Sequence, residues 1–173
     1  MPNFGSIINS HNKKIINSNI PKQPVPTCNC RLKSSCPLNG NCMQSSLVFI
    51  CKADTPNIIE NHPRYIGLTE NTFKDRFYKH KNSFKYESKR NATELSNFVW
   101  ENKHTSTETN LVWNILDEAR AHRPEIKRCF LCLTEKYHIM FSKLNLLNSR
   151  NELITKCRHE NKFYLVNFKD NIT

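Results

Sequence analysis

The sequence predicts an α+β domain in which a small, mostly antiparallel sheet of three strands is flanked by helices and carries cysteine-rich additions. Three observations favour this class. Short apolar runs and segments of helical spacing follow one another in the order β-β-α-α-β-α. A chain of 173 residues suits one compact domain with a small appendage. Most of the eight cysteines fall into two groups with short internal spacings.

The first 27 residues are predicted to form a flexible tail or linker. They are rich in Asn, Lys, Ser, Ile and Pro, and three prolines, Pro21, Pro24 and Pro26, would interrupt a regular element. We therefore divide the chain into four parts, which are a tail or linker over 1–27, a Cys-rich knuckle over 28–45, the main domain over 46–160 and a C-terminal tail over 161–173.

The first half of the main domain is predicted to hold two strands and a helix. Leu47–Cys51 is a short apolar run typical of a buried strand, and Tyr65-Ile66-Gly67 ends a second strand. Residues 70–87 place phenylalanines at roughly helical spacing, with a basic opposite face. Thr69 is expected to cap this helix by accepting a bond from a backbone N–H group.

The second half of the domain is predicted to add two helices and one strand. Thr93 is expected to cap a helix over 93–100, and residues 110–116 alternate enough to form the third strand. Residues 162–168 could form a short strand or an extended tail. A last helix is predicted from Cys129 to about residue 147, with four apolar side chains available for packing, which are Leu133, Ile139, Met140 and Leu144.

The charge balance predicts a polyanionic partner. A net charge of +11 and a pI of about 9.4 are far from neutral, and nucleic acid is the leading candidate. No apolar run approaches the roughly 20 residues of a transmembrane helix, and the N-terminus lacks the apolar core of a signal peptide. A membrane surface could also attract this charge. We nevertheless expect no membrane partner, and an intracellular, nuclear location. Only three glycines occur, which excludes Gly-rich phosphate-binding loops.

Four residues are candidates for chemistry on a phosphodiester. Arg76 offers a permanent charge that can bind phosphate in a bidentate manner. His80, one turn later, could shuttle a proton or hold Tyr65 or a water in place. Glu135, on another predicted helix, could hold Mg²⁺ with water filling the remaining positions. The alternative is an ordinary surface with a snorkelling arginine, a surface histidine, a half-buried tyrosine and a solvated glutamate.

The cysteine spacings predict two zinc sites. Cys129-x2-Cys132 and Cys157-x-His159 supply three thiolates and one imidazole, which fit tetrahedral Zn²⁺. The alternative for this group is a set of small buried apolar cysteines. The knuckle offers a second site with four thiolates, Cys28, Cys30, Cys36 and Cys42, for which disulfides in an oxidising compartment are the alternative. Cys51 lies in an apolar strand and is expected to be a core residue.

Basic residues of the 70–87 helix are the candidate DNA-binding surface. Phosphate contacts from such a surface would give salt-dependent affinity with little sequence preference. The alternative is a basic face that is merely solvated. Trp100 and Trp113 are expected to be core residues rather than platforms for base stacking. The lysines assigned to DNA are Lys74, Lys79, Lys81 and Lys85.

The same residues resemble a known family. Tyr65-Ile66-Gly67, Arg76, His80 and the distant Glu135 are similar to the motifs of the GIY-YIG endonuclease superfamily. Further segments resemble the C-terminal endonuclease of Penelope-like retroelements, and the resemblance spans about residues 28 to 160. These segments are Cys28-Asn29-Cys30, Cys36-Pro37-Leu38, Phe73-Lys74-Asp75-Arg76, Thr93-Glu94-Leu95-Ser96, Val112-Trp113-Asn114-Ile115, Cys129-Phe130-Leu131-Cys132, Leu147–Leu153 and Cys157-Arg158-His159.

The resemblance implies a role for each site residue. Tyr65 matches the second motif tyrosine, Arg76 the arginine that stabilises the transition state, His80 the residue that assists proton transfer, and Glu135 the carboxylate that binds the divalent metal. The departure is the first motif, where the family has tyrosine and this chain has Phe49. Phe49 has no hydroxyl, so activity would be impaired or moved to Tyr65, His80 or water.

The function implied by the resemblance is a metal-dependent DNA endonuclease that nicks target DNA for retroelement insertion. Catalytic Mg²⁺ and structural Zn²⁺ are the implied cofactors. The implied partners are double-stranded DNA and a reverse transcriptase domain of the same element. One alternative is a non-catalytic, zinc-supported nucleic-acid-binding module, and another is a zinc-dependent protein-interaction domain.

Overall fold

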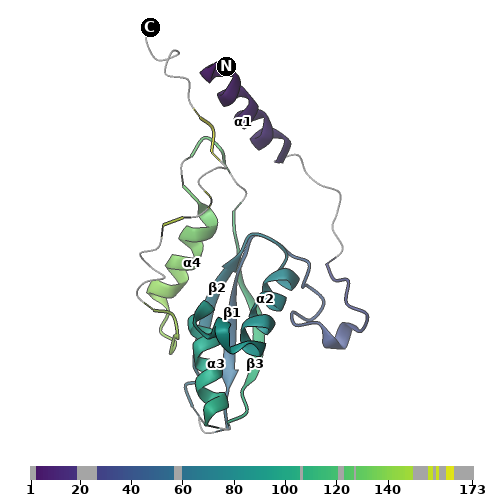
Figure 1. Ribbon diagram of the computed structural model, residues 1–173, viewed down its shortest axis with the longest axis vertical. Coiled ribbons are helices and arrows are strands. Elements are labelled where there is room, and N and C mark those ends of the chain that lie inside the picture. Colours follow the sequence, from purple (N-terminus) through teal and green to yellow (C-terminus); the bar gives the residue numbers. More distant parts are fainter. Residues whose placement is uncertain are drawn as a thin grey trace.

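The computed structural model describes residues 3–18, 27–56, 60–105, 107–120, 123–126, 128–149, 156–157, 159 and 163–165. Within them the chain forms α1 (Phe4–Ser18), β1 (Leu47–Asp54), β2 (Arg64–Thr69), α2 (Phe73–Lys85), α3 (Glu94–His104), β3 (Asn110–Glu118) and α4 (Phe130–Phe141). Two short 3-10 helices, η1 (Lys33–Ser35) and η2 (Glu87–Ala92), lie between them. The predicted α+β class with an antiparallel sheet of three strands is therefore confirmed for the part of the chain described (Figure 1).

The sheet has the order β2-β1-β3, and both pairs are antiparallel. β1 is central because its residues are apolar toward both faces, and Leu47, Val48 and Phe49 are all buried. A bulge between Val48 and Phe49 shifts the pairing with β3. Across β1 and β2, Phe49 lies opposite Gly67, which brings the two predicted motif positions side by side.

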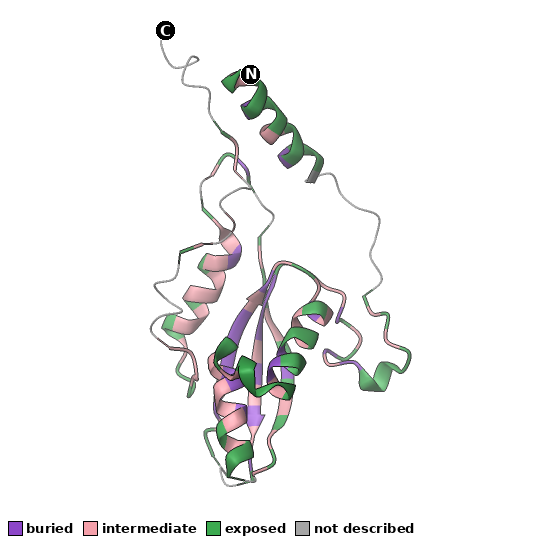
Figure 2. Cartoon of the chain, in the orientation of Figure 1, coloured by how far each residue is buried: buried purple, intermediate pink, exposed green. Residues whose placement is uncertain are grey.

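Helices cover both faces of the sheet. Side chains alternate along each strand. One set packs with α2 and α3 in a cluster that contains Phe49, Tyr65, Trp113 and Phe73. The other set, with Val48 and Ile66, packs against α4. Figure 2 shows the buried strands enclosed by the helices.

Thr72 caps α2, so the expectation that Thr69 does so is wrong. Thr72 Oγ1 accepts a hydrogen bond from the Asp75 N–H at 3.2 Å. Thr69 is the last residue of β2, and its hydroxyl donates to the Asn71 carbonyl. The predicted cap of α3 is confirmed, because Thr93 Oγ1 accepts from the Ser96 N–H at 3.1 Å.

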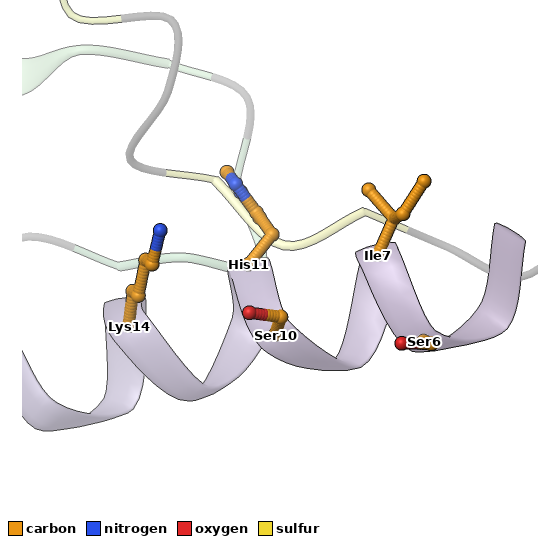
Figure 3. Close-up of a pocket in the computed structure, with 5 residues that line it drawn as sticks. All are labelled: Ser6, Ile7, Ser10, His11 and Lys14. Atoms are coloured by element: carbon orange, nitrogen blue, oxygen red, sulfur yellow. The ribbon is translucent and has the colours of Figure 1, made fainter. Parts of the chain in front are cut away.

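The N-terminal segment contains a helix where an irregular tail was expected. Along α1, Ile8 and Ile15 are buried, and their spacing of two helical turns places them on one stripe. His11 Nε2 lies 2.8 Å from the Phe163 carbonyl oxygen, so α1 contacts the C-terminal segment. Figure 3 shows a pocket beside His11 on this helix. The three prolines of 19–26 lie outside the described residues.

α4 is shorter than predicted and packs through a different stripe. It ends at Phe141 rather than near residue 147. Leu131 and Ile139 pack against the sheet, whereas Leu133, Met140 and Leu144 are exposed. Leu131 and Ile139 lie at i and i+8 along one row of α4. Leu133 and Met140 lie on another face of the helix, and Leu144 lies beyond its end.

Residues 163–165 form neither helix nor strand, and the rest of the predicted C-terminal tail lies outside the described residues. Within the described ranges, no helix combines the length and apolar character that crossing a bilayer requires.

Candidate active site and metal centres

Three aromatic rings meet on the face of the sheet that α2 and α3 cover. The ring of Tyr65 lies 6.5 Å from that of Phe49 and 6.0 Å from that of His80, measured between centroids. The rings of Phe49 and His80 are 5.9 Å apart. Tyr65 is 3% exposed and His80 is 2% exposed. The alternative of a surface histidine and a half-buried tyrosine is therefore wrong for these two residues.

His80 is a neutral imidazole at neutral pH. Burial disfavours its charged form, and the nearby Arg76 charge adds to this effect, so the pKa of His80 is lowered from 6.5 to about 3. Its Nε2 atom is buried and has no hydrogen-bond partner among the described residues. A group in this state can hold a hydroxyl or a water, but it is a poor proton donor.

Arg76 lies on α2 close to His80. Phe77 contacts Trp113 of β3 at 5.8 Å between ring centroids, and Arg76 is rotated by about 100° around the helix from Phe77. Its guanidinium is close enough to His80 to lower the pKa of that imidazole. The Arg76 Nε atom is buried and has no hydrogen-bond partner in the described part of the chain. Arg76 therefore brings an unused donor to the edge of the ring cluster.

Glu135 approaches the sheet from the other face. Its neighbours one turn away on α4, Leu131 and Ile139, pack against the cluster that contains Val48 and Ile66. Glu135 is half-buried on this stripe. α2 and α4 cover opposite faces of the sheet, so Arg76 and Glu135 approach it from opposite faces, and α4 packs on the edge strand β2. A ligand shared by the two would have to lie at the outer edge of this strand.

Asn148 occupies part of that edge and was not singled out as a site residue from the sequence. Its Oδ1 accepts from the Ile66 N–H, and its Nδ2 donates to the Ile66 carbonyl, both at 2.8 Å. Nearby, the Arg64 N–H donates to the Asn145 carbonyl. These bonds occupy backbone groups that an edge strand would leave unpaired. The only sequence signal was the position of Asn148 in a segment shared with the resembling family.

The C-terminal Cys and His residues form a compact group. The ligand atoms of Cys129, Cys132, Cys157 and His159 all lie within 4.8 Å of one another. His159 Nδ1 is 3.3 Å from Cys129 Sγ and 3.4 Å from Cys132 Sγ. Tetrahedral zinc with bonds of about 2.0–2.3 Å would place its ligand atoms roughly 3.3–3.8 Å apart. This group could therefore hold a metal ion such as zinc.

The knuckle cysteines form a second group with the same property. All four sulfur atoms lie within 4.8 Å, and Cys42 Sγ is 3.7 Å from both Cys28 Sγ and Cys30 Sγ. All eight cysteines of the chain are free thiols in this structure. Burial raises the pKa of the Cys36 thiol, but hydrogen bonds with backbone groups of Leu38 and Gly40 and with the Cys28 and Cys42 side chains together outweigh it and bring the pKa to about 6. Such bonds favour a thiolate, the form that binds metal.

Cys51 is a core residue, as predicted. It is fully buried in β1, and burial raises the pKa of its thiol strongly. Trp113 is also a core residue, while Trp100 is half-buried and donates its indole N–H to the Ser83 carbonyl at 2.8 Å.

The predicted DNA-binding lysines of α2 lie on two flanks of the helix. Lys74, Lys81 and Lys85 follow i, i+7, i+11 spacing and share one flank, where Lys81 Nζ lies 5.5 Å from the Phe77 ring centroid. Lys74 also donates to Asn29 Oδ1 of the knuckle at 2.6 Å. Lys79 lies on the other flank with Arg76. Lys79, Lys81 and Lys85 are exposed.

No family model, curated protein or solved structure matches this chain. The resemblance to the GIY-YIG superfamily therefore rests on the sequence motifs, of which residues 150–153 and Arg158 lie outside the described residues.

Proposed function

We propose that the chain is a metal-dependent DNA endonuclease of the GIY-YIG type that nicks target DNA for retroelement insertion. The observation that carries the proposal is the Arg76 guanidinium, with its buried Nε lacking a partner among the described residues, beside the packed rings of Tyr65 and His80. A positive charge with an unused donor, beside an imidazole that packs against a phenol, is suited to an anionic phosphodiester. The net charge of +11 supports a nucleic-acid substrate.

Each residue then has a distinct task. Arg76 holds the non-bridging oxygens of the phosphate and stabilises the charge that develops on them. The neutral His80 imidazole orients the Tyr65 hydroxyl or a water through hydrogen bonding. Glu135 is the residue that would hold Mg²⁺, which when bound supplies further positive charge at the phosphate. Phe49 supplies only its ring, so within the three-ring cluster the phenolic hydroxyl comes from Tyr65.

The test is the nicking of supercoiled plasmid in Mg²⁺ by the full chain and its variants. Arg76→Ala is expected to slow nicking by about 10²–10³-fold, the usual loss on removing a charge-stabilising donor. Arg76→Lys should recover only part of this loss because it lacks the bidentate fork. Glu135→Gln should also slow nicking. Arg123→Ala and Glu125→Gln are matched controls, since both residues are exposed in the segment before α4.

A nicking rate unchanged by Arg76→Ala would show that the assigned site is wrong. Circular dichroism and the melting temperature of each variant show whether a loss of nicking comes from the removed side chain or from unfolding of the chain.

A second function is favoured by Phe49 and by the burial of His80. In this alternative the chain is a non-catalytic, zinc-supported module that binds nucleic acid after loss of the first motif tyrosine. Phe49→Tyr distinguishes the two, because the Phe49 ring already packs beside His80 and a hydroxyl there restores the missing group. Nicking that appears or rises in Phe49→Tyr supports an assembled but damaged site. Salt-sensitive DNA binding without nicking in both proteins supports the module.

A further inference from the structure

We propose that the Glu70 carboxylate orients His159 in a metal centre formed with Cys129, Cys132 and Cys157, and that this contact fastens the centre to the turn between β2 and α2. The inference rests on the metal-compatible groups and does not require the endonuclease activity. It gives Glu70 a positioning role that the sequence motifs did not indicate.

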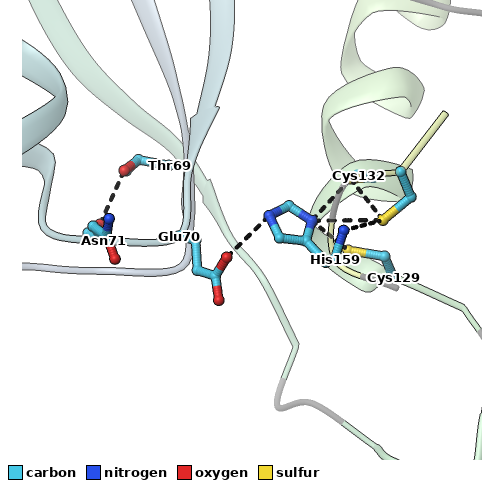
Figure 4. A network of polar contacts seen from close by, with 7 residues as sticks. Thr69, Glu70, Asn71, Cys129, Cys132 and His159 are labelled. Carbon is cyan, nitrogen blue, oxygen red and sulfur yellow. Dashed lines mark hydrogen bonds and ion pairs between the residues drawn. The ribbon is translucent and has the colours of Figure 1, made fainter. Parts of the chain in front are cut away.

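The two nitrogens of His159 face different partners. Nδ1 lies 3.3–3.5 Å from the three cysteine sulfurs, while Nε2 lies 3.1 Å from Glu70 Oε2 (Figure 4). In a neutral imidazole, an N–H donated from Nε2 to the carboxylate leaves the Nδ1 lone pair available for a metal ion. Histidines that bind metals commonly donate their second nitrogen to a carboxylate in this way. The observed contact therefore selects the tautomer that the cysteine group requires.

Glu70 is held by the fold and is not a freely moving surface acid. It directly follows Thr69, the last residue of β2, and its carbonyl accepts the Ser46 N–H at 3.2 Å. The Thr69 hydroxyl donates to the Asn71 carbonyl at 3.0 Å, and this hydrogen bond fixes the backbone just after Glu70 in the same turn. The side chain thus reaches His159 from a turn whose backbone is already fixed.

The knuckle holds the other end of the same turn. The Phe73 N–H donates to the Gln44 carbonyl, and the Lys74 N–H donates to the Cys42 carbonyl, both at 2.8 Å. These bonds satisfy N–H groups that the first turn of α2 leaves free. The segment from Glu70 to Lys74 therefore lies between the two metal-compatible groups, and α2 carries Arg76 directly after it.

The first experiment measures zinc affinity by competition with a chromophoric chelator, using the full chain loaded with zinc. In this competition, the step in which the C-terminal group releases its zinc is identified as the step that disappears in His159→Ala. Glu70→Gln is expected to weaken zinc binding at this group by about 10–100-fold, as for other partners of metal-binding histidines. Zinc binding at the knuckle should not change. Glu108→Gln is the matched control, because Glu108 is exposed and lies outside both groups.

The second experiment follows amide hydrogen exchange over 69–74 by mass spectrometry. Cys157→Ser removes one sulfur ligand, and it should raise exchange in this turn if the metal centre holds the turn through Glu70. In the Glu70→Gln background, exchange should already be raised and Cys157→Ser should add little. The proposal is overturned if Glu70→Gln leaves the zinc affinity unchanged, or if Cys157→Ser leaves amide exchange over 69–74 unchanged. Both outcomes are independent of whether the chain nicks DNA.

Discussion

At Gly67 the backbone passes so close to two rings that a larger residue does not fit. A Cβ atom there would lie 2.7 Å from Phe49 Cζ and 2.9 Å from Tyr65 Cε1, and both rings are buried. Packing against Phe49 and Tyr65 thus requires a glycine at position 67. This is a physical reason for a residue pattern that the sequence showed only as a motif.

Gly67→Ala is therefore expected to lower the free energy of unfolding by about 1–3 kcal/mol, the usual cost of overpacking a core. Urea denaturation of the zinc-loaded chain measures the change. Gly5→Ala is the control, because a Cβ at Gly5 would meet only Asn3 Oδ1 at 3.4 Å, which is ordinary contact. Equal stability of the Gly67→Ala variant and the parent would contradict the close packing of Phe49 over this position.

His80 makes stability depend on pH. Its pKa is lowered from 6.5 to about 3 in the folded chain, first by burial and then by the Arg76 charge. Below pH 6.5 the unfolded chain binds a proton that the folded chain does not bind. The free energy of unfolding should therefore fall by up to about 1.4 kcal/mol per pH unit as the pH drops from 6.5 toward 3.

The measurement compares urea unfolding of the parent and of His80→Leu across this range. Acid also affects the cysteine groups, but it does so in both proteins, so only the difference between the curves reports on His80. Curves that stay parallel from pH 7 downward would contradict a buried neutral imidazole.

At the scale of single elements, Thr72 determines where α2 begins. Its Oγ1 accepts the Asp75 N–H, and its hydroxyl donates to Asp75 Oδ2 at 2.7 Å, so two hydrogen bonds join the cap to the first turn of the helix. Thr72→Ala should destabilise the chain by about 1 kcal/mol, and Thr72→Ser should restore most of this loss because the hydroxyl is kept. Thermal unfolding of the two variants measures the difference. A Thr72→Ser variant as unstable as Thr72→Ala would mean that the hydroxyl is not the stabilising group.

The strands and α3 could be predicted from the sequence because each has a local signal. β1, β2 and β3 show apolar runs or alternation, and Thr93 precedes a helix with no competing cap. Thr69 and Thr72 could each have capped α2, and only the length of β2 decides between them. The sequence signal for α1 is weak, because only Ile8 and Ile15 mark its buried stripe and three prolines follow it closely.

The same distinction applies to the site: the cysteine groups could be predicted from local spacing, whereas the contacts of the other site residues could not. Short spacings such as Cys129-x2-Cys132 already indicate shared ligation. The contacts of Glu70 with His159 and of Asn148 with Ile66 join residues distant in the sequence. The position of Glu135 depends on which face of the sheet α4 covers. These features follow from the tertiary fold, and no local pattern encodes them.

At the scale of the whole molecule, the sheet separates two surfaces. One is formed by α2, α3 and the knuckle beside α2, and the other by α4. The flank of α2 with Lys74, Lys81 and Lys85 belongs to the first surface. Lys143 is exposed just after α4 and lines a pocket with Ile50 and Ile66 on the second. If DNA lies along the first surface, lysines of the two surfaces must contribute differently to its affinity.

The salt dependence of DNA binding tests this difference, because each phosphate contact adds about 0.9 to the slope of log affinity against log salt. Replacing both Lys81 and Lys85 by Ala should therefore reduce the slope by about 2, with a similar loss for unrelated duplex sequences. Lys143→Ala should leave the slope unchanged. Fluorescence anisotropy with a labelled duplex, read from low to moderate salt, supplies both values. A slope that responds to Lys143→Ala but not to the double replacement would place the duplex on the α4 surface, away from Arg76.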